Sequence, residues 1–183
     1  SGTPDMALHY TYDYGTPEIS AAFGRLPIVV DHTYPGQMCT VAAARGIPAC
    51  LPEFGGGPST SLADGVTGVL NVLRWTGQMP GELEGPAVLP LISNVTLLLA
   101  SPHGSLVTDV PATQNSSTVS AGTLGEVRCA VDGRVLERFE VADDGILLMS
   151  RTAPMIVTPG DYVFMVGHPD DEIELPRPGA FRA

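Results

Sequence analysis

In Leu51-Pro52-Glu53-Phe54-Gly55-Gly56-Gly57-Pro58, an apolar segment that begins at Gly46 ends at one carboxylate and three glycines. Successive glycines do not continue a strand well, because they adopt left-handed backbone angles and let a ligand or a second backbone come close. A carboxylate at a strand end, beside such a loop, is a common way to place an acid or base at the mouth of a pocket. The alternative is a tight strand-to-helix turn with a solvated Glu53. Spacing alone leaves both interpretations open.

The residues before the glycines predict alternating strands and helices. Strands are expected at 6–14, 26–30 and 47–51, and helices at 17–23 and 38–45. Thr16-Pro17-Glu18 is typical of a helix start, with Thr as the N-cap and Pro at the first helical position. Gly24 and Gly46 are expected to end the two helices. This β-α-β-α-β order favours an α/β layer with a parallel or mixed sheet.

A longer helix is expected after the glycines, capped by one of the residues 59–61 and ended by Gly77. Its apolar residues recur at helical spacing: Leu62, Val66, Val69, Leu70 and Leu73. From Val88 onward, short apolar runs alternate with turns, which is typical of a small all-β barrel or sandwich. Strands are expected near 95–99, 106–110, 125–130, 134–141, 145–149 and 162–166, with a loop at 115–118.

These patterns together predict an α/β fold with two domains. Residues 1–80 are expected to form the α/β domain, and residues 81–169 a β-rich, barrel- or sandwich-like domain. Residues 170–183, which are acidic and proline-rich, are expected to form an extended tail.

Composition and charge exclude several function classes. Of the 183 residues, 44% are hydrophobic and 16% are charged, which indicates a well-packed globular protein. The net charge of −11 argues against nucleic acid and anionic membrane surfaces as partners, because both need basic protein surface. No apolar run is long enough to cross a membrane.

The nine basic residues are all Arg, so Schiff-base chemistry, a P-loop lysine and the biotin or lipoyl carrier function are excluded. Cys39, Cys50 and Cys129 are widely spaced and form no Cys-x-x-Cys pair, so neither a disulfide framework nor a cysteine zinc site is indicated. Free thiols suit a reducing compartment, and we predict a cytoplasmic protein.

Several segments, in this order, resemble the second half of the catalytic domain of the succinylglutamate desuccinylase/aspartoacylase family. They are Ala22-Phe23-Gly24, Pro35-Gly36, Gly46-Ile47-Pro48-Ala49, Glu53-Phe54-Gly55-Gly56 and Gly65-Val66-Thr67-Gly68-Val69-Leu70-Asn71-Val72-Leu73. Later turns resemble the β-rich C-terminal domain of bacterial members: Ser101-Pro102-His103-Gly104, Val141-Ala142-Asp143-Asp144-Gly145 and Pro159-Gly160-Asp161. The family comprises zinc-dependent amide hydrolases with a carboxypeptidase-like α/β fold. The resemblance therefore implies the C-terminal part of such a domain, followed by a small all-β domain.

The resemblance also implies roles for particular residues. Glu53 matches the family's general acid/base beside the zinc, where it takes a proton from water and later gives it to the leaving amine. Gly55 and Gly56 are expected to line the substrate site. Independently of the resemblance, Arg45 and Arg25 are candidates for holding a substrate carboxylate through a bidentate pair, with surface solvation as the alternative for each.

The zinc ligands are where the sequence departs from the family. In the family, the zinc ligands are a His-x-x-Glu pair and a later His, all upstream of the matched region. This chain has no His-x-x-Glu. His32 in Asp31-His32-Thr33 is the remaining candidate ligand, although its distance to Glu53 along the chain is too short for the family pattern. The other histidines, His9, His103 and His168, form no helix-face pair, and His168 is expected to be solvated. We expect this chain to be a C-terminal portion whose zinc ligands come from residues outside it.

Two functional hypotheses follow. The first is a zinc-dependent deacylase that acts on an N-acyl amino acid or a related small amide, with this chain supplying the acid/base Glu53. Its expected partners are the N-acylated substrate, the missing N-terminal half or a companion chain, and further copies of itself as a homo-oligomer. The alternative is a non-catalytic binding or regulatory module that keeps the fold without the metal site.

Overall fold

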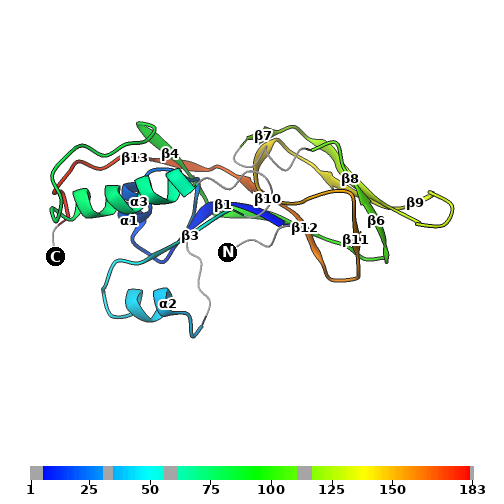
Figure 1. Cartoon of the computed structure of the whole chain (residues 1–183), viewed down its shortest axis with the longest axis horizontal. Helices are drawn as coiled ribbons and strands as arrows, with labels where there is room; N and C mark the ends of the chain where they lie inside the picture. Colours follow the sequence, from blue (N-terminus) through cyan, green and yellow to red (C-terminus); the bar gives the residue numbers. More distant parts are fainter. Residues whose placement is uncertain (1–5, 31–34, 56–61, 111–116, 182–183) are drawn as a thin grey trace. The chain divides into compact units, whose positions relative to one another are not determined.

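The computed structural model describes residues 6–30, 35–55, 62–110 and 117–181, with the elements labelled in Figure 1. The chain forms two compact units. We call one the α/β unit (Tyr10–Glu53, Ser61–Ser93 and Pro169–Ala183) and the other the β unit (Ser1–His9, Phe54–Thr60 and Asn94–His168). The segment 81–93 and the C-terminal tail thus belong to the α/β unit, while the boundary between independent domains at residue 80 stays a prediction.

A mixed sheet forms the centre of the α/β unit. Strand β1 (Met6–Asp13) runs parallel to β2 (Ile28–Val29), which runs parallel to β4 (Val88–Ile92). Strand β13 (Asp171–Glu174) is antiparallel to β4 at the edge, and β3 (Cys50–Gly55) pairs with β1. The predicted parallel or mixed sheet is confirmed. The tail that was expected to be merely extended contributes one of its strands.

Ile28 marks the core of this sheet. It lies opposite Thr11 on one side and Leu91 on the other, and its side chain is completely buried. Ala21 and Leu89 are buried in the same cluster. A short apolar strand is therefore covered on both faces, as expected for a central parallel strand.

Helix α1 (Pro17–Phe23) begins and ends as predicted, but a different side chain makes the hydrogen bonds at its start. Gly24 ends it in the left-handed conformation, with φ 73°. Thr16 occupies the N-cap position, yet its side chain makes no capping hydrogen bond. The carboxylate of Asp13 instead accepts hydrogen bonds from the backbone N–H of Gly15 (2.9 Å) and of Thr16 (3.1 Å). Asp13 thus orders the entry into α1 by an Asx-type turn.

Helix α3 (Leu62–Trp75) confirms the predicted long helix, and Gly77 follows it with φ 74°. Its orientation differs from what the apolar spacing predicts. The buried residues are Gly65, Gly68, Asn71 and Trp75. Leu62, Val66 and Val69 are 78%, 51% and 57% exposed. The physical reason is close helix packing, because the ring of Phe23 in α1 occupies the space in which a side chain at position 68 would lie.

Replacing Gly68 with alanine is expected to destabilise the α/β unit. A Cβ atom at position 68 would lie 2.3 Å from two ring atoms of Phe23, a ring that is only 4% exposed. Such overpacking costs about 1–3 kcal/mol. Urea unfolding followed by the fluorescence of Trp75, the single tryptophan, measures the loss. Val66→Ala on the exposed side of α3 is the control, and equal stability of Gly68→Ala and the parent protein would contradict the packing argument.

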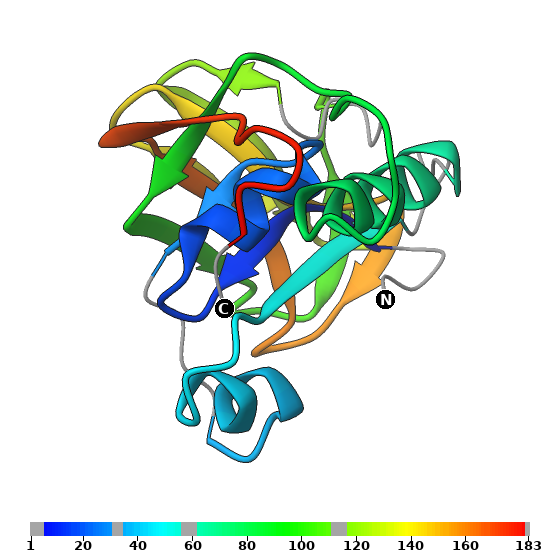
Figure 2. The same ribbon diagram turned by 90° about the vertical axis from the view of Figure 1, so that its left-hand side faces the viewer.

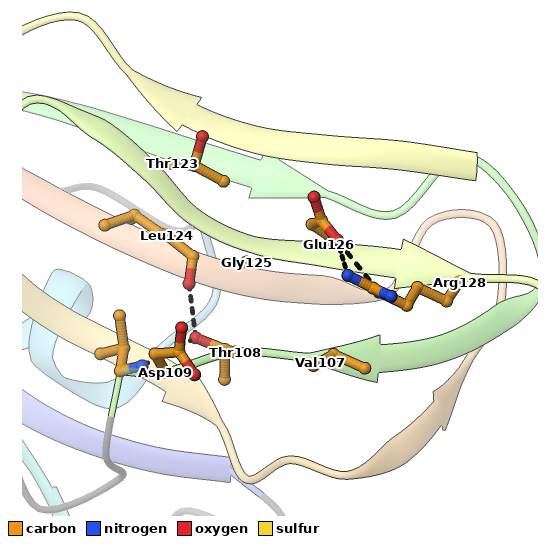
Figure 3. A pocket seen from close by; sticks show the side chains of 9 residues that line it. Val107, Thr108, Asp109, Thr123, Leu124, Gly125, Glu126 and Arg128 are labelled. Carbon is orange, nitrogen blue, oxygen red and sulfur yellow. Dashed lines mark hydrogen bonds and ion pairs between the residues drawn. The ribbon is translucent and has the colours of Figure 1, made fainter. Parts of the chain in front are cut away.

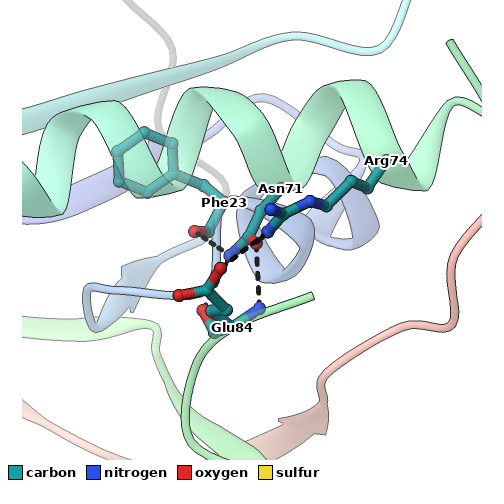
Figure 4. Close-up of polar contacts among 4 residues, drawn as sticks. All are labelled: Phe23, Asn71, Arg74 and Glu84. Atoms are coloured by element: carbon teal, nitrogen blue, oxygen red, sulfur yellow. Dashed lines mark hydrogen bonds and ion pairs between the residues drawn. The ribbon is translucent and has the colours of Figure 1, made fainter. Parts of the chain in front are cut away.

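A buried amide joins α3 to the segment that follows it (Figure 4). The Asn71 Nδ2 group donates to the carbonyl oxygens of Phe23 (3.3 Å) and Glu84 (2.7 Å), and its Oδ1 accepts from the backbone N–H of Glu84 (2.9 Å). Arg74 adds an ion pair to the Glu84 carboxylate at 2.9 Å. One completely buried side chain therefore fixes α1, α3 and the loop at residue 84 together.

The β unit is built from two groups of strands. In the first, β10 (Gly145–Arg151) pairs with the start of β1, with β7 (Thr118–Val119) and with β12 (Tyr162–His168), which pairs in turn with β5 (Asn94–Leu99). The second is a separate antiparallel sheet in the order β11-β6-β8-β9. Its strands are Met155–Val157, Gly104–Val107, Gly122–Arg128 and Val135–Val141.

One apolar core fills the β unit. It unites Leu106, Val127 and Phe139 of the second sheet with Leu147 and Phe164 of the first. The rings of Phe139 and Phe164 meet edge to face, with centroids 5.8 Å apart. The predicted strand-rich second half is confirmed, although Thr118 lies in β7 rather than in a loop. The whole architecture is mixed α/β and dominated by strands.

No helix in the described part of the chain combines the length and the apolar character needed to cross a bilayer.

Candidate functional site

Strand β3 positions Glu53, the residue on which the sequence analysis concentrates. The predicted strand 47–51 placed Glu53 after the strand end. The observed strand runs from Cys50 to Gly55, so Glu53 lies inside it. Its side chain is half-buried. Gly55 ends the strand at φ 106°, an angle that favours glycine. Gly56, the second glycine expected to line the substrate site, lies outside the described residues.

The arginines proposed as carboxylate holders are both engaged within the protein. Arg25 contacts Oδ1 of Asp64 through Nε (3.0 Å) and Nη2 (2.5 Å), which ties the loop after α1 to the first turn of α3. Arg45 is exposed and donates from Nη1 to the carbonyl oxygen of Val41 (3.3 Å), in helix α2 (Met38–Ala43). Arg25 therefore has a structural role, and substrate binding by Arg45 stays a prediction.

The structure describes two of the four histidine side chains, those of His103 and His168. His32 lies outside the described residues, and His103 is exposed just before β6. His168 is half-buried, and its ring nitrogens have protein partners: Nε2 lies 3.0 Å from Oγ1 of Thr96, and Nδ1 lies 3.2 Å from the carbonyl oxygen of Asp144. Across the described ranges, no three His, Cys, Asp or Glu side chains come together in a way that could hold a metal ion.

Two cysteines meet at the start of the strand that carries Glu53, a contact that the sequence analysis missed. The thiol of Cys39 in α2 lies 3.5 Å from the carbonyl oxygen of Cys50 in β3. Burial, helped by the nearby Cys39 and Asp13, raises the pKa of the Cys50 thiol to about 12. Cys39 and Cys50 lie on either side of Gly46 in the sequence, and this spacing was the available sign that they come close together. Cys50 is thus a protonated, inert thiol at neutral pH, and not a nucleophile.

Native Cys50 is expected to resist alkylation. A pKa raised from 9.0 to about 12 lowers its thiolate fraction at pH 8 by about a thousandfold. Iodoacetamide treatment at pH 8, followed by peptide mass spectrometry, should leave Cys50 unmodified in the folded protein. The same treatment in concentrated guanidinium chloride should label it, and rapid labelling of the folded protein would show that this burial is wrong.

A pocket of about 410 Å³ lies in the β unit (Figure 3). It is lined by Val107, Thr108, Asp109, Val110, Thr123, Leu124, Gly125, Glu126 and Arg128. Its size suits a small ligand. Glu126 pairs with Arg128 (2.7 Å) and Arg138 (3.0 Å), and hydrogen bonds from Arg138 and then Arg128 hold its pKa below the ordinary range. The Glu126 carboxylate is therefore engaged by two arginines of the same unit, and Glu53 is not among the lining residues.

Comparisons by sequence give no relative: no protein-family model matches the chain, and no curated protein matches it significantly.

Solved structures share the fold. A succinylglutamate desuccinylase/aspartoacylase from Rhodobacter sphaeroides is 23% identical, and the match covers 93% of this chain and 57% of that one, with a TM-score of 0.73. The ectoine utilization protein EutE from Ruegeria pomeroyi is 20% identical, with 91% and 57% covered and a TM-score of 0.73. An aspartoacylase family protein from Mesorhizobium loti is 19% identical, with 92% and 60% covered and a TM-score of 0.68.

The chain therefore spans less than two thirds of these structures, and it matches their C-terminal portion. At such low identities the match establishes the fold. The resemblance seen in the sequence is confirmed at that level.

Proposed function

We propose that this chain is the C-terminal portion of a deacylase that hydrolyses an N-acyl amino acid or a related small amide, with Glu53 as its general acid/base. The observation that carries the proposal is the position of Glu53, half-buried in β3 and two residues before the strand ends at Gly55. The fold shared with a succinylglutamate desuccinylase/aspartoacylase supports it.

In the proposed reaction, the Glu53 carboxylate accepts a proton from a water molecule as the water oxygen attacks the acyl carbonyl carbon. The protonated Glu53 then donates that proton to the amide nitrogen as the C–N bond breaks. The products are a carboxylic acid and a free amine, and Glu53 returns to its ionised form. A half-buried carboxylate suits both steps, because it is shielded from bulk water but still reachable by substrate.

The zinc that the resemblance implies does not fit the described residues alone, since these assemble no group of three ligands. We therefore assign no step of the reaction to zinc on this chain. We propose that its ligands come from polypeptide outside this chain, equivalent to the unmatched part of the solved structures.

The test is a fusion of the unmatched N-terminal portion of the Rhodobacter sphaeroides protein to the complete 183-residue chain. The fusion is expected to release amine from N-succinylglutamate or from an N-acylated aspartate, and to lose this activity on chelation. The 183-residue chain alone is expected to be inactive. A folded fusion that hydrolyses neither substrate would overturn the deacylase proposal and favour the non-catalytic binding module.

A further inference from the structure

The outward face of α3 is apolar throughout. Its residues fall within about one third of the helix circumference. They are Leu62, Ala63, Val66, Val69, Leu70 and Leu73, and we call them the α3 face. The exposed fractions of Leu62, Val66 and Val69 range from 51% to 78%, and Ala63 is exposed as well. No charged residue interrupts this face, which is unusual for a solvated helix.

This orientation of α3 is fixed by its other side, so the exposure does not arise from a rotated helix. Gly68 packs directly on Phe23, and the Asn71 amide is buried with its hydrogen bonds satisfied. The charged residues of α3 are engaged away from the apolar face: Asp64 pairs with Arg25, and Arg74 with Glu84. A helix with small, buried residues on one side and apolar residues on the other is typical of an element that is covered from both sides.

Helix α2, also in the α/β unit, gives a second and independent sign of a missing cover. Its six residues, Met38–Ala43, include none that is buried, and Met38 is 84% exposed. Figures 1 and 2 show it standing apart from α1 and α3. A six-residue helix is too short to be stable without packing. Ile47, just after it, is 55% exposed.

The solved structures extend well beyond the part that matches this chain. Their matched part corresponds to almost all of this chain, yet it makes up only 57% to 60% of their length. Polypeptide outside the match is therefore the natural neighbour of a helix whose outer face has no cover here. A second copy of this chain is the less favoured occupant, because two molecules of net charge −11 repel each other.

We propose that the α3 face is the docking surface for a polypeptide equivalent to the unmatched N-terminal portion of the solved structures, which binds it through an apolar surface. The inference deepens the proposed function, on which it rests for the identity of the partner. The docked polypeptide is the one expected to bring the zinc ligands to Glu53.

The experiment uses the N-terminal portion of the Rhodobacter sphaeroides protein as a separate polypeptide, co-expressed with the 183-residue chain. Size-exclusion chromatography with light scattering is expected to show a 1:1 complex. The double variant Val66→Glu/Val69→Glu is expected to bind at least about 100-fold more weakly, because it buries two carboxylates in an apolar interface. Val131→Glu/Val135→Glu, which changes two exposed valines of the β unit, is the matched control and is expected to bind normally.

Circular dichroism and Trp75 fluorescence establish that the double variant is folded. If it is not, Val69→Cys replaces it, and the complex is expected to protect the new thiol from alkylation. The inference would be overturned if the parent chain formed no complex or if the double variant bound equally well. It would also be overturned by an unprotected thiol at position 69, or by a homodimer that the double variant dissociates. An active fusion without a complex in trans refutes only the docking surface. A complex whose fused form is inactive refutes only the deacylase.

Discussion

Glutamine in place of Glu53 is expected to lower the turnover of the proposed fusion enzyme by about 10²–10⁴-fold, the range typical of a lost general acid/base. The amide has nearly the same shape as the carboxylate, but it cannot accept the proton of the attacking water. Because Glu53 is half-buried in the middle of β3, the substitution keeps the strand and its pairing with β1. The measurement is amine release at saturating substrate, alongside the unfolding midpoint of each protein.

Glu18→Gln provides the matched control. Glu18 is an exposed carboxylate of the same unit, in the first turn of α1. Its replacement changes the net charge by the same amount and is expected to leave turnover unchanged. If Glu53→Gln and Glu18→Gln turn over substrate equally well, Glu53 is not the acid/base of the reaction.

Leucine in place of Asn71 is expected to cost about 3–5 kcal/mol of unfolding free energy. The two side chains are similar in volume, so the loss isolates the hydrogen bonds. Two carbonyl groups, those of Phe23 and Glu84, lose their donor, and the N–H of Glu84 loses its acceptor. Urea unfolding followed through Trp75, one helical turn further along α3, measures the effect.

Asn94→Leu is the control for this substitution, because Asn94 is exposed at the start of β5. Its cost is expected to stay within about 0.5 kcal/mol. A similar cost for both variants would mean that the Asn71 amide does not hold the three segments together.

Much of the architecture could be predicted because it depends on local rules. Pro17 and Gly24 mark the ends of α1, and both act through their own backbone angles. The short apolar runs of the second half form strands as predicted. Alternation and turn residues are signals that involve only residues close together in the sequence. Gly55 ends β3 with the positive φ that glycine favours, while the loop predicted after it lies outside the described residues.

The larger failures depend on distant partners. The orientation of α3 is set by Phe23 and by the loop at Glu84, neither of which is visible in the helix sequence. Strand β13 reads as a polar tail, because only its pairing with β4 makes it a strand. Glu53 could be chosen from the resemblance, but the cysteine contact beside it required α2 to fold back after Gly46.

The C-terminal strand has a consequence for how the molecule is made. The α/β unit takes most of its residues from the first half of the chain, yet β13 completes its sheet edge and Phe181 packs on Trp75 with ring centroids 4.9 Å apart. Because synthesis runs from the N-terminus, these residues are made after all the rest of the α/β unit. Until they emerge, the edge of β4 lacks its partner strand and Trp75 lacks the cover of Phe181.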